Sequence, residues 1–315
     1  MVNLRKNVKS LSPNEKAHFI EAVKALKENT KGKRVADNKY DDYVLWHAQT
    51  MIIAAGSDVK NNMRNRAHRG TVFLPWHREF LRRFELDLQQ EVSDVTIPWW
   101  DWTADANLRS QDPQIPAWTL SPIWKEDFMG GNGEPNNDYI VGTGPFKDWI
   151  TQELDDAGNP SIKDRLRRDF GNLVSTLPSQ IDLYNIFAYE FFDTPYWDVF
   201  SKGFSNALEG WLNRPQLHNR VHLWVGGSML LNTSPNDPVF FLNHCNVDRI
   251  WSLWQDLRYD HGYPDDGTII DRNAKKIDYY NLTDKIFPWQ DEPESKSIEN
   301  VLEHRNLNYC YVYEK

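Results

Sequence analysis

The stretch that decides the fold is residues 236–251, which read NDPVFFLNHCNVDRIW. Asp237-Pro238 marks the start of a helix, because aspartate caps a first turn and proline fits its opening position. Apolar residues then recur every three or four positions, which predicts a helix over about 239–256 with one buried face. The stripe consists of Phe240, His244, Val247, Trp251 and Trp254. A histidine therefore stands among the apolar residues of this helix.

Three further segments repeat this combination of an apolar stripe and histidine. One helix is predicted over about 40–54, a second after Pro75, and a third opened by Pro215. The histidines on their stripes are His47, His77, His218 and His222. Metal sites in helical bundles are built in this way, from side chains on facing helices.

The remaining sequence adds one more helix and much loop. Ser12, Pro13 and Glu15 form a capping box that starts the first helix. Residues 92–200 read as loops because prolines and glycines interrupt them, and the tail 309–313 reads as a short strand. We expect a mainly α protein with a single domain over residues 1–315.

Six of the nine histidines fall into two sets of three. These sets are His47, His68 and His77, then His218, His222 and His244. A single histidine on an apolar stripe is usually a buried, hydrogen-bonded side chain. Several buried imidazoles need several partners, because an unpaired buried polar group is costly. His218 and His222 are four residues apart on one helix face, so that they can bind one metal ion together.

The donor set limits the choice of metal. Six imidazoles without a carboxylate suit copper better than magnesium, calcium or manganese. Di-iron bundles need two Glu-x-x-His motifs, and this chain has one, Glu15-Lys16-Ala17-His18. Zinc with three histidines per ion remains open at this point. A pair of copper sites would have a clear use, because each ion can give one electron to dioxygen while a substrate oxygen binds at an open position.

Composition excludes several classes of protein. The chain has 315 residues and a formal net charge of −9, which argues against binding to nucleic acid or to an anionic membrane. Two cysteines exclude a disulfide framework, and no apolar run is long enough to span a membrane. No signal peptide is visible at the N-terminus, which favours a cytoplasmic protein; export with a partner protein is compatible with the same sequence.

Several motifs together resemble a known family. They are Trp46-His47, Ala67-His68-Arg69-Gly70, Phe73-Leu74-Pro75-Trp76-His77-Arg78-Glu79, residues 216–227 (QLHNRVHLWVGG) and residues 236–251. In this order they resemble tyrosinases of the compact bacterial type, which are type 3 dicopper proteins like catechol oxidases, o-aminophenol oxidases and haemocyanins. The resemblance extends through Ile97-Pro98-Trp99-Trp100-Asp101-Trp102 and the aromatic tail, and it covers nearly the whole chain.

The resemblance implies a fold, a cofactor and a reaction. It implies a four-helix bundle that holds two copper ions, with long loops and a few short strands around it. His47, His68 and His77 would bind copper A, and His218, His222 and His244 would bind copper B. Dioxygen would be the co-substrate. The implied activity is hydroxylation of monophenols to o-diphenols and oxidation of o-diphenols to o-quinones.

The resemblance also suggests roles for residues beside the ligands. In bacterial tyrosinases, residues at the positions of Glu209 and Asn219 are thought to hold a water that takes the proton of an incoming phenol. The alternative is that Glu209 is a helix surface residue and that Asn219 only bonds the backbone. Further candidates for the substrate pocket are Trp211, Leu223, Asn232 and Asn243. Asn243 stands where many relatives have a second histidine.

The sequence leaves open two alternative functions and several partners. A catechol oxidase or o-aminophenol oxidase without activity on monophenols is the first alternative, and an oxygen carrier is the rival from another class. We expect small phenols or aminophenols as substrates, and a homodimer and a copper-delivery protein are compatible with the sequence. The arginines between residues 64 and 83 could attract a carboxylated substrate, although a solvated or paired role is the preferred interpretation.

Overall fold

The computed structural model describes residues 3–31, 34–58, 64–155, 158–212, 216–258, 262–265, 267–307 and 310–314. Its α-helices are α1 (Pro13–Glu28), α2 (Lys39–Ile52), α4 (Phe73–Glu91), α5 (Trp102–Asp105), α6 (Gln180–Phe187), α7 (Phe204–Glu209), α8 (Leu217–Val225) and α9 (Val239–Arg258). Its strands are β1 (Asn3–Arg5), β2 (Gly133–Glu134), β3 (Ile140–Val141), β4 (Ile150–Leu154), β5 (Pro160–Arg165) and β6 (Tyr311–Tyr313). Short 3-10 helices such as Gly227–Leu230 and Ser234–Asn236 connect them.

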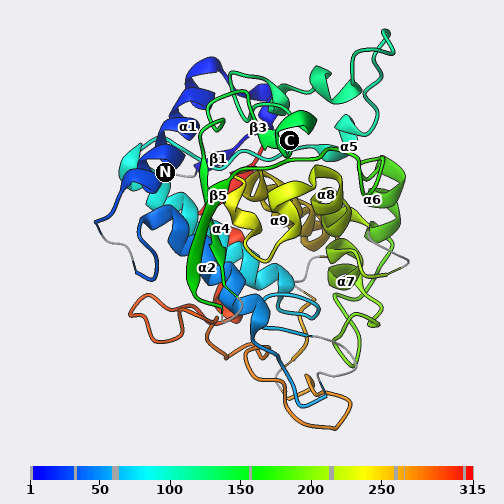
Figure 1. Cartoon of the computed structure of the whole chain (residues 1–315). Coiled ribbons are helices and arrows are strands. Elements are labelled where there is room, and N and C mark those ends of the chain that lie inside the picture. The colour runs from blue at the N-terminus through cyan, green and yellow to red at the C-terminus, as the bar shows by residue number, and fades with distance from the viewer. Residues whose placement is uncertain are drawn as a thin grey trace.

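Four helices form the centre of the molecule. Figure 1 shows α2, α4, α8 and α9 grouped in the middle, with loops and short strands around them. The expected mainly α fold, a four-helix bundle wrapped by loops, is therefore confirmed. None of the described helices combines the length and the apolar character that crossing a membrane requires.

The helix starts follow the predicted signals, with one shift. Ser12 and Glu15 form the reciprocal capping box at the start of α1. Helix α9 begins at Val239, whose N–H donates to the Asp237 carboxylate at 3.0 Å. Helix α4 begins at Phe73 rather than after Pro75, because proline is tolerated in a first turn where its missing N–H has no intrahelical partner. Pro215, predicted to open α8, lies outside the described residues.

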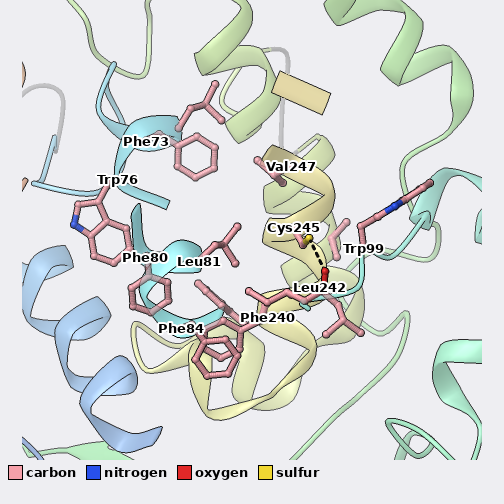
Figure 2. Packing of buried hydrophobic residues seen from close by; sticks show 14 of the residues in the cluster. Phe73, Trp76, Phe80, Leu81, Phe84, Trp99, Phe240, Leu242, Cys245 and Val247 are labelled. Carbon is pink, nitrogen blue, oxygen red and sulfur yellow. Dashed lines mark hydrogen bonds between the residues drawn. The ribbon is translucent and has the colours of Figure 1, made fainter. Parts of the chain in front are cut away.

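The core between α4 and α9 is built from stacked aromatic rings. Phe84 of α4 lies parallel to Phe241 of α9, with 3.5 Å between the ring centroids. Tyr43 of α2 meets Phe84 edge to face at 5.1 Å, so that three helices share one cluster. Figure 2 shows the α4 side chains Phe80 and Phe84 directed toward Phe240 and its neighbours on α9. Burial of each such ring contributes roughly 1.5–3 kcal/mol, which holds the bundle helices together.

The region 92–200 is more regular than predicted. It contains the two-turn helix α6 and the antiparallel hairpin β4–β5, in addition to shorter elements. The expectation of loops alone was wrong. Ser179 and Asp182 form a capping box that starts α6, and the sequence-based prediction did not include it. Each element is short, and short elements give little periodicity in sequence.

The two ends of the chain lie side by side. β6, within the predicted tail strand, pairs in parallel with β1, and Asn3 is opposite Tyr311. Tyr309, the first residue of the predicted strand, lies outside the described residues. The paired strands lie beside α4, because Arg5 of β1 forms an ion pair with Glu85 of α4 at 2.8 Å.

Candidate metal centre

The first histidine triad comes from two helices and the loop between them. His47 lies on α2, His77 lies on α4, and His68 lies on the intervening loop. The loop holds its shape because the Asn65 side-chain oxygen accepts from the backbone N–H groups of Ala67 at 3.0 Å and His68 at 2.7 Å. The ligand atoms of the three imidazoles all lie within 4.8 Å of one another.

The second triad comes from α8 and α9. His218 and His222 lie one turn apart on α8, and His244 lies on α9. Their ligand atoms also lie within 4.8 Å of one another. The imidazole of His244 stacks on that of His77 at 4.1 Å between centroids, so the two triads face each other across α4 and α9.

Backbone carbonyls orient three of the imidazoles. Nδ1 of His47 bonds Asn232 O at 2.6 Å, Nδ1 of His77 bonds Phe73 O at 2.8 Å, and Nδ1 of His222 bonds Met229 O at 2.7 Å. A carbonyl can only accept, so Nδ1 carries the proton and Nε2 presents a lone pair.

The turn after α8 supplies one of these carbonyls. Gly226 ends the helix at φ +68°, a left-handed conformation that favours glycine. A Cβ at this position would lie 2.7 Å from Asp169 O. The turn places the carbonyl oxygen of Met229 next to Nδ1 of His222. Gly226 therefore helps to orient the His222 imidazole.

The six histidines fit a pair of metal ions. Nε2 of His47, His77 and His222 is buried without a hydrogen-bond partner among the described residues, which is costly unless a ligand is bound there. Nε2 of His218 and Nε2 of His244 converge to 3.1 Å. Burial lowers the pKa of all six imidazoles, to about 3 for His47 and to about 4 for His222. They are therefore neutral, as metal binding requires.

A cavity of about 540 Å³ opens onto both triads. His47 and His68 of the first triad and His218 and His222 of the second triad line it. Five of the six residues predicted beside the ligands also line this cavity: Glu209, Trp211, Asn219, Leu223 and Asn232. A small molecule that enters the cavity therefore meets the imidazoles of both triads.

Asn243 is the exception among the predicted pocket residues. It is fully buried on α9 and lies outside the cavity lining. Its amide nitrogen and oxygen have no hydrogen-bond partner among the described residues. The predicted place of Asn243 in the substrate pocket is not supported, because its side chain is fully buried away from the cavity, whereas Asn219 and Leu223, which also follow ligands on a helix, line it.

Glu209 connects the two halves of the site. It is the last residue of α7 and is buried, so the alternative that Glu209 is a helix surface residue was wrong. Its carboxylate oxygens accept from the backbone N–H of Arg69 at 2.9 and 3.0 Å, and its carbonyl lies 3.3 Å from His218 Nδ1. Burial raises the pKa of Glu209 to about 7.

Gly210 allows the chain to turn directly after Glu209. It has φ +109°, and a Cβ there would lie 2.1 Å from Gln216 O. The left-handed turn therefore needs glycine. Asn219 follows His218 on α8, and its Oδ1 lies 3.1 Å from His218 Nδ1. Glu209 and Asn219 thus approach the same ligand from two helices.

Four arginines, the buried cysteine and the other described histidines take no part in the triads. Arg64, Arg78, Arg82 and Arg83 are buried and pair with carboxylates, as the preferred interpretation predicted. Cys245 is a packed thiol that donates to Ile97 O at 3.3 Å, a contact visible in Figure 2. His304 is structural, with Nδ1 2.8 Å from Tyr311 O. His18 is exposed beside Asp94, and His261 lies outside the described residues.

Sequence reasoning missed several lining residues. Met51, Met229, Leu230 and Leu231 give the cavity much of its apolar wall. Met51 stands one turn after His47, which is a signal that helical spacing provides. The other three follow the turn at Gly226, and only the folded turn places them over the triads.

The fold and the site define a class of protein. Two triads of neutral imidazoles, held by four helices and opening onto one cavity, form the dinuclear centre of a type 3 copper protein. Residues 37–257 match the family model described as the common central domain of tyrosinase. The chain belongs to the tyrosinase family.

Individual relatives agree with this assignment. The chain is 35% identical to a tyrosinase of Streptomyces glaucescens, over 95% of this chain and 97% of that protein. It is also 35% identical to grixazone synthase of Streptomyces griseus, over the whole of both chains. Among solved structures it resembles a polyphenol oxidase from Thermothelomyces thermophila with a TM-score of 0.73 and 22% identity, covering 100% of this chain and 89% of that one.

Family membership decides between the metals that the sequence left open. The cofactor is a pair of copper ions with dioxygen as co-substrate, and the two histidine triads are positioned to bind them. The chain is a copper-dependent oxidase of small phenolic compounds.

Proposed function

We propose that the enzyme hydroxylates monophenols to o-diphenols and then oxidises o-diphenols to o-quinones. The observation that carries this proposal is the position of Glu209 and Asn219. Both line the cavity, and both approach His218, which we assign to copper B. A monophenol must lose its proton before its oxygen binds a metal well, so a proton acceptor at this place favours hydroxylation.

The residues of the cavity have separate tasks in this proposal. The copper pair, when bound, supplies the activation and reduction of dioxygen. Leu223, Leu230 and Leu231 offer an apolar wall for the aromatic ring. Glu209 and Asn219 hold a water between a carboxylate and an amide, and this water passes the phenolic proton to Glu209.

Oxygen uptake separates the candidate activities. The copper-loaded protein should consume dioxygen with a monophenol, with an o-diphenol and with an o-aminophenol, each measured alone. Uptake with the last two substrates but not with the monophenol would refute hydroxylation. Reversible binding of dioxygen without turnover would identify an oxygen carrier instead.

The second candidate is an oxidase of o-diphenols or o-aminophenols that does not act on monophenols. One observation favours it: a relative that matches the chain over its full length is named grixazone synthase rather than tyrosinase. The single domain over residues 1–315, the cytoplasmic location, the homodimer and the copper-delivery partner stay predictions.

Replacing Glu209 with glutamine should reduce turnover of the monophenol far more than turnover of the o-diphenol. The amide keeps the size of the side chain and one acceptor for the Arg69 N–H, but it cannot take a proton. General-base assistance contributes roughly 10²–10⁴-fold, so we expect the ratio of the two kcat values to fall by about 10²-fold or more.

Glu153→Gln is the matched control for this variant. Glu153 is a partly buried carboxylate that bonds Thr233 outside the cavity lining, so its loss should leave the ratio unchanged. Equal losses on both substrates in Glu209→Gln would argue against a base and for a positioning role toward Arg69.

A further inference from the structure

The cavity above the two triads contains very few charged groups. Among the described lining residues, Arg69 is the one permanent cation and Glu209 the one carboxylate. The six imidazoles are neutral in this environment. The protein as a whole has a formal net charge of −9 and does not attract anions. Apart from the charge of the bound copper ions, which all variants in the test share, a preference of the cavity for an anion would arise locally, from Arg69.

The backbone of Arg69 is held in one conformation. Its φ of +65° is uncommon for a residue with a side chain, and its N–H donates to both oxygens of Glu209. A position that keeps such a backbone is over-determined by its surroundings. The Cα–Cβ bond of Arg69 consequently leaves the loop in a defined direction, immediately after the ligand His68.

The side chain of Arg69 lies against the wall of the cavity. Its guanidinium carbon is 5.0 Å from the centroid of the Trp211 ring, within the range of a cation–π contact. Trp211 itself lines the cavity, so the cation sits beside the space that a substrate enters. A cation placed on an aromatic face loses little freedom when it binds a ligand.

The neighbouring arginines have other positions. Arg66 stacks on the rings of Tyr279 and Phe287, at 4.0 and 4.6 Å, and does not line the cavity. Arg78 is buried against Asp248. Of the arginines between residues 64 and 83, Arg69 is the one that the described cavity lining includes.

We propose that the guanidinium of Arg69 binds a carboxylate on the substrate, so that the enzyme prefers phenols that carry an acid group. A guanidinium offers five N–H donors in a planar fork, and a carboxylate accepts two of them at once. Contacts of Arg69 to other groups are compatible with this role, because the fork has more donors than one carboxylate uses. The proposal requires that phenols enter this cavity, and it is independent of whether monophenols are hydroxylated.

Glu209 contacts Arg69 without occupying the end of its side chain. It bonds the backbone of Arg69, whereas the guanidinium is at the far end of the same side chain. We expect directed hydrogen bonds inside the cavity, rather than long-range attraction, to select the acid, because salt screens close pairs within a protein much less than exposed charges. We therefore expect the preference to depend weakly on salt concentration.

The test compares o-diphenols that differ in charge alone. 3,4-Dihydroxybenzoate and 3,4-dihydroxybenzamide have nearly the same shape, and both report oxidation without requiring hydroxylation. The ratio of their kcat/KM values, acid over amide, is measured for the copper-loaded wild type, Arg69→Gln, Arg69→Lys and Arg66→Gln. Comparing ratios between variants cancels the different intrinsic reactivities of the two compounds and any general loss of activity.

We expect the ratio to fall by about 10- to 100-fold in Arg69→Gln, the value of a charge-assisted hydrogen bond. Arg69→Lys should keep part of the preference, because lysine retains the charge but lacks the fork. Arg66→Gln makes the same chemical change two residues before His68 and should keep the wild-type ratio. An unchanged ratio in Arg69→Gln overturns the proposal, and so does an equal fall in Arg66→Gln.

A binding measurement covers the case of inactive variants. Calorimetric titration of the copper-loaded proteins with benzoate and benzamide reports recognition without turnover. Tighter binding of benzoate to the wild type, lost in Arg69→Gln, supports the proposal even if no phenol is oxidised. Equal affinity of the wild type for both compounds overturns it. Failure of the proposed hydroxylation would instead appear as absent uptake with monophenols while the acid preference persists.

Discussion

Replacing His218 with alanine should remove about one copper ion per chain and abolish phenol oxidation. His218 and His222 form one side of the second triad, and Nε2 of His218 lies 3.1 Å from Nε2 of His244. Loss of a group that merely orients a metal ligand costs roughly 10–100-fold in metal affinity or activity. Loss of the ligand itself leaves two imidazoles for one ion, so the effect should be larger.

The measurement is the copper content of the purified protein after loading and dialysis, read beside oxygen uptake with an o-diphenol. His18→Ala is the matched control, because His18 is an exposed histidine beside Asp94 on the surface. It should retain two ions and full activity. A His218→Ala protein that still holds two copper ions would show that His218 is not a ligand. Circular dichroism checks that the variant remains folded.

Most of the proposed ligand set could be predicted because helices have a regular period. His47, His77, His218, His222 and His244 all stand on apolar stripes, and a stripe faces the interior of a bundle. His68 has no such signal. It lies on a loop, and its place in the triad depends on the Asn65 turn, so it was assigned from its position in the chain between His47 and His77 and from the motif Ala67-His68-Arg69-Gly70.

The surroundings of the ligands were harder to predict than the ligands. The hydrogen bond from Arg69 to Glu209 joins residues 140 positions apart, and local sequence patterns do not predict contacts at such a separation. Asn243 shows the opposite error, since a position next to a ligand in sequence was taken for a position in the pocket. Asn219 and Leu223 stand next to ligands in the same way and line the cavity, so a place beside a ligand in the sequence does not by itself decide which side chains face the cavity.

The second large effect concerns the group that joins the two ligand helices, Asp248. It lies on α9 one turn after His244, and its Oδ1 is 2.6 Å from Nε of Arg78, the residue after His77 on α4. Its Oδ2 accepts from Tyr311 at 2.6 Å and lies 3.5 Å from Arg5. Asp248 therefore braces α9 against α4 and the two ends of the chain through hydrogen bonds.

Replacing Asp248 with alanine should lower the free energy of unfolding by about 3–5 kcal/mol, because it leaves the buried guanidinium of Arg78 without its counter-charge and that of Arg5 with Glu85 alone. Arg5 and Arg78 are both fully buried, and neither can release its proton to escape the cost. Denaturant unfolding measures the change. Asp127→Ala is the control, since the pair of Lys16 with the exposed Asp127 should contribute less than about 1 kcal/mol.

The pH dependence tests whether the charge of Asp248 is the cause. Burial raises the pKa of Asp248, but Arg78 and Arg5 together outweigh this effect, and the net pKa lies below its ordinary value. A carboxylate with a lowered pKa stabilises the fold above its unfolded pKa of about 3.9, and this stability is lost as the pH falls through the lower folded value. The difference in stability between wild type and Asp248→Asn should be full at neutral pH and shrink below about pH 4.

A constant difference at all pH values would assign the effect to packing and hydrogen bonds.

The location of the bond between Arg78 and Asp248 predicts a second effect, on copper retention. Because Arg78 adjoins His77 and Asp248 adjoins the turn of His244, breaking their bond loosens the stacked pair His77–His244 that joins the two triads. Asp248→Asn, which keeps the size of the side chain, should therefore lose copper more readily than Asp127→Ala under the same dialysis. Equal retention would show that the bundle holds the two triads in register without this bond.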